Sequence, residues 1–111
     1  MDINDMKVGE FVELMGLLKQ PLQRDDTAWE IGKNYLIRTV TMIDTGKLVA
    51  VTEHELVLED AAWIADTGRF AQAVEAAEFG EVEPFPKGRV VIGRGSIIDA
   101  VQIKLAPRSL K

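Results

Sequence analysis

The chain has 111 residues, the size of one domain, and its 47% hydrophobic and 28% charged residues are typical of a folded globular protein rather than a disordered one. Cysteine is absent and His54 is the single histidine, which excludes disulfides, thiolate metal sites and histidine-rich metal sites. The formal net charge of -5 means that any nucleic acid must be bound by a local basic patch. We therefore expect one domain over 1–111 without a cofactor.

Two features of the sequence predict where the protein is located. Residues 1–5 are acidic and do not have the basic region and apolar run of a signal peptide. No stretch approaches the roughly 18 consecutive apolar residues of a membrane span. We therefore expect a cytoplasmic protein without a membrane partner.

The first predicted element is an amphipathic helix over 4–19, which Pro21 ends. Residues 20–33 are polar and predict a loop. The hydrophobic residues of the helix recur at helical spacing and would form one apolar stripe: Val8, Phe11, Val12, Met15 and Leu18.

Three consecutive strands are predicted over 35–65. Residues 35–43 are β-branched and partly alternating, which favours a first strand. The Asp-Thr-Gly sequence at 44–46 predicts a turn, and 47–51 predicts a second strand. Residues 52–55 form a polar break of hairpin length before a third strand over 56–65.

The second half of the chain predicts a helix and two further strands over 89–105. Helical spacing of apolar residues indicates an inserted helix over 67–79, followed by an extended connector to residue 88. Gly93 to Ser96 predicts a tight turn or bulge between the last two strands. Because all connections but one are short, we expect a mostly β fold: a small, bent, five-stranded antiparallel barrel with an N-terminal helix and one inserted helix.

Two stretches of sequence resemble the motifs of the Sm-like family, which includes the Sm proteins and bacterial Hfq. Residues 46–51 and 56–61 are similar to the first motif, a strand that starts with glycine, a turn, and a strand that ends in acidic residues. Residues 90–98 are similar to the second motif, an Arg-Gly pair between two apolar strands. Thr52 and Glu55 stand where the family normally carries an aspartate and an asparagine, so the chain resembles an atypical member, of the kind that phages encode, which would place it in the host cytoplasm.

The resemblance implies self-assembly into a ring of about five to seven subunits. In such rings the fourth strand of one subunit pairs with the fifth strand of the next, which removes exposed sheet edges. The apolar segments 90–92 and 101–103 agree with this, because they are unfavourable as solvent-exposed edges. A closed monomeric barrel would fit them as well.

The same resemblance implies a site for single-stranded RNA at the pore. There the turn that contains His54 would lie beside Arg94 and Gly95, with Lys47 nearby. Imidazole and guanidinium groups can stack on bases and bind phosphates, and glycines permit positive φ and close backbone approach. The alternative is that His54 is an exposed turn residue with no role in binding.

Arg94 also has an alternative role. It could belong to a β-bulge that closes the barrel, with its guanidinium paired to Asp99 or Asp60. The glutamates on either side of His54 would repel phosphate, which favours the alternative for that residue.

Two other classes of function are open. One is a purely structural assembly protein, such as a phage virion component, that binds no nucleic acid. The other is a retroviral-type aspartic protease, because the stretch around Asp44 resembles the catalytic Asp-Thr-Gly of that family. Residues 91–94 resemble the later glycine segment of the same family. Lys47 follows Gly46 where that family has a small residue, and a helix rather than a flap hairpin lies between the two segments, so we expect no enzymatic activity.

Overall fold

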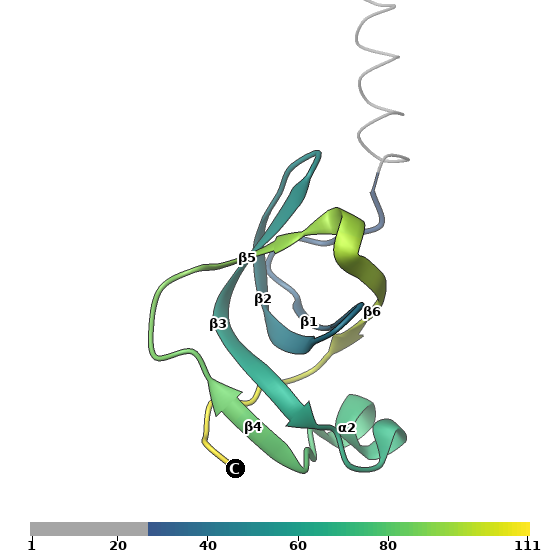
Figure 1. Ribbon diagram of the computed structural model, residues 1–111, viewed down its shortest axis with the longest axis vertical. Helices are drawn as coiled ribbons and strands as arrows, with labels where there is room; N and C mark the ends of the chain where they lie inside the picture. The colour runs from purple at the N-terminus through teal and green to yellow at the C-terminus, as the bar shows by residue number, and fades with distance from the viewer. Residues whose placement is uncertain (1–26) are drawn as a thin grey trace, which may run out of the picture.

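A computed structural model describes residues 27–111, and Figure 1 shows that they form a strongly curved β-sheet with one short α-helix beside it. The predicted N-terminal helix over 4–19 lies outside the described residues. The mostly β, antiparallel fold predicted from the sequence is confirmed, but the described residues form six strands rather than five.

The elements follow one another in an order close to the predicted one. Three consecutive antiparallel strands cover the predicted region 35–65, and the short helix follows them. The bounds of the elements are β1 Asn34–Thr39, β2 Ile43–Val51, β3 Glu55–Asp66, α2 Phe70–Ala76, β4 Glu81–Pro84, β5 Val90–Gly93, the 3-10 turn η1 Arg94–Ser96, and β6 Ile97–Ile103.

The turn predicted at residues 44–46 is wrong, because these residues lie inside strand β2. The chain instead reverses at residues 40–42, where the Thr39 N–H donates to Met42 O at 2.8 Å and the Met42 N–H donates to Thr39 Oγ1 at 2.9 Å. Gly46 is used for close packing: a Cβ atom on it would lie 3.0 Å from Leu58 Cβ. The prediction failed because a glycine that lets two strands approach closely cannot be told from a turn glycine in the sequence.

A closed barrel is not what the described residues form. The sheet has the strand order β4-β3-β2-β1-β6, with β5 also paired to β3, and it stays open between β5 and β6. Strand β4 lies in the segment predicted as an extended connector. It forms because β3 is 12 residues long, so that its first half pairs with β5 and its second half pairs with β4.

A β-bulge in β3 explains the curvature of the sheet. Lys47 and Thr45 of β2 are two residues apart, but their partners on β3, Glu59 and Ala62, are three residues apart. Strand β3 therefore has one extra residue here, and Asp60 within this stretch has a φ of 51°. An extra residue bends the strand and moves the following side chains to the opposite face. Leu58 and Ala61 therefore belong to one hydrophobic cluster, whereas Ala62 belongs to the other.

The sheet is buried on both faces by these two clusters. Tyr35 and Ile37 of β1 point into the first cluster, and Leu36 between them points into the second. Helix α2 covers the second cluster with Ala73, so the inserted helix packs on the sheet of its own chain. Figure 1 shows α2 beside the end of β3.

The last residues of the chain cover the outer edge of β4. The Val82 N–H donates to Lys111 O at 2.9 Å, and the Lys111 N–H donates to Val82 O at 3.0 Å. Within residues 27–111, no helix has the length and apolar character needed to cross a membrane.

Candidate functional site

The structure brings together three of the four residues predicted to bind RNA. His54 lies in the turn between β2 and β3, and Arg94 begins η1 directly after β5. The Arg94 N–H donates to His54 O at 2.8 Å, and Arg94 Nη1 donates to Thr52 O at 2.6 Å. Gly95 is the next residue and is exposed. We call this group of residues, Thr52 to Glu55 with Arg94 and Gly95, the His54 corner.

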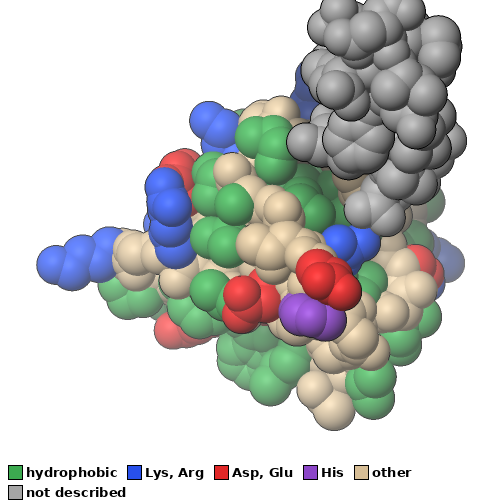
Figure 2. All heavy atoms as spheres, turned by 90° about the horizontal axis from the view of Figure 1, so that it is seen from above, with side chains coloured by type: hydrophobic (Ala, Val, Ile, Leu, Met, Phe, Trp, Pro, Cys, Tyr) green, Lys and Arg blue, Asp and Glu red, His purple; other side chains and the backbone are tan. Residues whose placement is uncertain are grey.

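The charges at the His54 corner are mixed. The imidazole is 83% exposed, and its Nε2 lies 3.9 Å from Oε2 of Glu53, which is itself 87% exposed. Glu55, on the other side of His54, is exposed as well. Figure 2 shows the histidine next to acidic side chains on this face of the molecule. The acidic neighbours oppose the binding of phosphate by the corner.

Arg94 does not make the ion pairs considered in its alternative role. Asp99 is bound instead by the guanidinium of Arg38, through Nε at 2.7 Å from Oδ1 and through Nη2 to Oδ2. This hydrogen-bonded pair lowers the pKa of Asp99. Arg94 is half-buried, and its bond to Thr52 O fastens the β2–β3 turn to η1.

Lys47 is not part of the His54 corner. It is exposed in the middle of β2, where its register partners are Asn34 on β1 and Glu59 on β3. The turn that holds His54 lies beyond the far end of that strand.

The glycines around Arg94 do not use the backbone freedom that the sequence suggested for them. Gly93 has a φ of -68°, and the positive-φ glycines among the described residues are Gly32, Gly68 and Gly88. A Cβ atom built on Gly93 or Gly95 meets nothing within 4 Å. The space beside them is open, as a close approach of another molecule would require.

Two strand edges close to the corner have no partner within residues 27–111. Strand β5 pairs with β3 on one side only, and β6 pairs with β1 on one side only. Both carry apolar side chains in solvent: Val91 is 54% exposed on β5, and Ile98 is 65% exposed on β6. Ile98 is the extra residue where the β1–β6 register shifts.

Asp44 lies in a regular strand rather than at a loop. It is half-buried between β1 and β3, opposite Ile37 and Trp63, and burial raises the pKa of its carboxyl group. The chain has a second Asp-Thr-Gly at residues 66–68. It forms a turn at the end of β3, in which the Gly68 N–H donates to Asp66 Oδ1 at 2.8 Å. The two motifs thus have different local structures.

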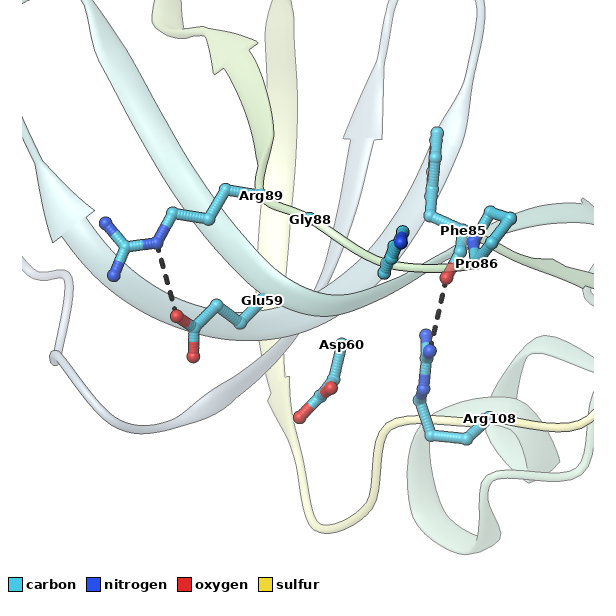
Figure 3. A pocket seen from close by; sticks show the side chains of 8 residues that line it. Glu59, Asp60, Phe85, Pro86, Gly88, Arg89 and Arg108 are labelled. Carbon is cyan, nitrogen blue, oxygen red and sulfur yellow. Dashed lines mark hydrogen bonds and ion pairs between the residues drawn. The ribbon is translucent and has the colours of Figure 1, made fainter.

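A cavity of about 430 Å³ that the sequence did not reveal lies between β3 and the β4–β5 connection (Figure 3). Three of the side chains that line it are cationic, but two of these are already engaged. Arg89 Nε donates to Glu59 Oε1 at 3.2 Å, and Arg108 donates to Phe85 O at 3.2 Å and to Ala61 O at 2.7 Å. These bonds hold the connection and the C-terminal segment against β3.

The scan against protein-family models and the search of curated proteins both found no match to this sequence. Among residues 27–111, no three histidine or acidic side chains are grouped in a way that could hold a metal ion.

Proposed function

We propose that this protein is a self-assembling β module whose subunits join strand β5 of one copy to strand β6 of the next. The product would be a cyclic homo-oligomer of the Sm-like type. The observation that carries the proposal is the pair of apolar edges on β5 and β6, which have no strand partner within residues 27–111. Exposed edges of this kind favour pairing with another chain, and natural proteins normally cover them.

Hydrogen bonding along β5 supports this use of the edge. The Arg94 N–H donates to His54 O, so these two residues form a hydrogen-bonded pair. Two residues earlier on β5, Ile92 is paired with Leu56 of β3, and its N–H points toward β3 in the same way. Hydrogen-bonded and non-hydrogen-bonded pairs alternate in antiparallel sheets, so the N–H of Val91 points away from β3. It is therefore a donor that faces the free edge.

Among the described residues, nothing fills the space beside the open edge of β6. A groove of about 510 Å³ runs along it, lined by residues 97–102 together with Trp29 and Tyr35. Val101 is 36% exposed on this strand. A second copy that placed β5 here would cover apolar surface on both partners. Repetition of this head-to-tail contact closes a ring when the rotation between neighbouring subunits divides a full turn.

Size-exclusion chromatography with light scattering tests the proposal. We expect the unmodified protein to elute as an oligomer and Val91→Pro to elute with the mass of a single chain. Proline removes the outward N–H of Val91 but leaves the ladder to β3, which does not use that donor.

The matched control is Val91→Ala, which shortens the side chain and keeps the N–H. We expect this variant to stay oligomeric, with weaker association than the unmodified protein. Circular dichroism checks that all three proteins have the same secondary structure. A monomeric unmodified protein, or an oligomer of unchanged size in Val91→Pro, would contradict the proposed β5–β6 pairing.

The second candidate function is binding of single-stranded RNA at the His54 corner. Its support is the hydrogen bond that joins Arg94 to His54, beside the open space at Gly95. Only Nη1 of the Arg94 side chain is bonded within the described residues, so its other donors can reach a phosphate. In a ring, the corner would be repeated once in each subunit.

A fluorescent oligouridine titrated at two salt concentrations tests RNA binding. We expect Arg94→Ala to weaken binding about tenfold and to lower the salt slope by about 1. The control is Arg89→Ala, because Arg89 is paired with Glu59 away from the corner. Assembly without RNA binding would instead favour a purely structural role, such as a virion component.

A further inference from the structure

A cavity of about 400 Å³ opens where β2, β3 and β4 lie side by side. It is lined by two aromatic side chains, two carboxylates, a methionine and two prolines. We call it the Trp63 pocket: Met42, Asp44, Trp63, Glu83, Pro84, Phe85 and Pro86. It holds neither a lysine nor an arginine.

Strand register fixes the centre of the Trp63 pocket. Asp44 on β2 is directly opposite Trp63 on β3, and Trp63 is directly opposite Glu83 on β4. Side chains at opposed positions lie on the same face of a sheet, with Cβ atoms about 5 Å apart. The indole therefore has a carboxylate on each side. The N–H of Phe85 donates to Ala61 O at 2.9 Å, which holds the second aromatic residue at the end of β4.

The aromatic surface of the pocket is open. Trp63 is 40% exposed, Phe85 is 37% exposed and Met42 is 49% exposed. Large aromatic side chains normally contribute most of the buried area in a core or an interface. In this pocket, instead, they line a hollow next to negative charge.

The carboxylates of the pocket have no cationic partner among residues 27–111. The ion pairs within residues 27–111 are Arg38–Asp99, Arg89–Glu59 and the contact of His54 with Glu53. None of them includes a residue of the pocket. Asp44 is half-buried, and this burial raises its pKa because the charged form is poorly solvated. A cation bound beside Asp44 would compensate for that lost solvation.

We propose that the Trp63 pocket binds an alkylammonium group, the charged head of a lysine side chain, a methylated lysine or a free quaternary amine. Such cations are attracted to the faces of aromatic rings, tryptophan above all, and to nearby carboxylates. Asp44 and Glu83 lie on opposite sides of the indole rather than together. A metal ion would need several carboxylate oxygens placed together.

A titration with choline tests the proposal, followed by the two indole N–H signals in NMR spectra of the full chain. We expect the Trp63 signal to shift and the Trp29 signal to stay, because Trp29 lies in the groove beside β6. The matched control ligand is 3,3-dimethylbutan-1-ol, which has the shape of choline without the charge. We expect it to bind about tenfold more weakly.

Two substitutions separate binding from folding. Asp44→Asn removes the half-buried charge, so we expect choline to bind about tenfold more weakly while the temperature of unfolding rises. Trp63→Leu keeps an apolar side chain but removes the aromatic face. We expect the backbone amide signals of Asp44 and Glu83, which shift with choline in the unmodified protein, to stay unshifted in this variant. An unshifted Trp63 signal, or equal binding of choline and its neutral analogue, would overturn the proposal.

Peptides containing lysine or trimethyllysine identify the source of the cation. Tighter binding of a peptide than of choline would support a lysine-bearing protein partner, and equal binding would support a free amine. The site shares no residue with β5, β6 or the His54 corner. Its test therefore succeeds or fails independently of the assembly proposal.

Discussion

Substituting Gly46 with valine is expected to lower the free energy of unfolding by about 2 to 3 kcal/mol. A Cβ atom on Gly46 would lie 3.0 Å from Leu58 Cβ, 3.1 Å from Leu58 Cδ1 and 3.2 Å from the Glu59 carbonyl oxygen. Leu58 is fully buried, so it cannot move aside without displacing the core. Strand β2 is also held on its other side, where Gly46 faces Tyr35 of β1.

Urea unfolding followed by circular dichroism measures this effect, with Gly95→Ala as the control. A Cβ atom on Gly95 meets nothing within 4 Å, and the φ of Gly95 is not among the positive values. We expect the control to change the free energy of unfolding by less than about 0.5 kcal/mol. Similar effects of the two substitutions would show that β2 and β3 do not approach as closely as the structure indicates.

The result for Gly46 also bears on the origin of the Asp-Thr-Gly sequence at residues 44–46. Gly46 packs closely against Leu58, so packing explains the glycine. Thr45 is fully buried, and its Oγ1 has no hydrogen-bond partner among the described residues. Asp44 lines the Trp63 pocket.

Replacing Leu36 with alanine is expected to lower the free energy of unfolding by about 3 kcal/mol. Leu36 is fully buried in the cluster between the sheet and α2, where Ala73, Phe79 and Val82 are also buried. The substitution removes apolar contacts and leaves a cavity, because β1 is fixed by β2 on one side and by β6 on the other. The substitution tests whether α2 packs on the sheet through the cluster that contains Leu36 and Ala73.

Urea unfolding gives the size of the effect, and hydrogen exchange shows where it acts. We expect the amides of α2 to exchange faster in Leu36→Ala, because the helix has seven residues and depends on this cluster. Val40→Ala is the control, since Val40 is 72% exposed in the β1–β2 turn. If both variants lost the same stability, the second cluster would not contribute as described.

Much of the strand content was predictable from the sequence, because it depends on neighbouring residues. The β-branched runs before and after His54 predicted the strands now seen as β1 to β3, and the apolar runs around Arg94 predicted β5 and β6. The association of His54 with Arg94 was also expected. It followed from the resemblance to the Sm-like motifs rather than from any local pattern.

Other features depend on contacts between distant segments, which no local pattern records. Strand β4 contains Pro84 and was predicted as a connector; it exists because the second half of β3 offers it an edge. The bulge at Asp60 decides which side chains face each hydrophobic cluster. Gly46 looked like a turn residue because the sequence does not show that Leu58 lies against it.

The sequence by itself therefore determined a mostly β chain, the order of its main strands and the chemistry available at His54 and Arg94. Only the tertiary structure decided that the sheet stays open at β5 and β6, and that Asp44, Trp63 and Glu83 form one row across three strands. The physical reason is that strand formation reflects the preferences of neighbouring residues, whereas register, bulges and pockets reflect contacts that exist only once the sheet has formed.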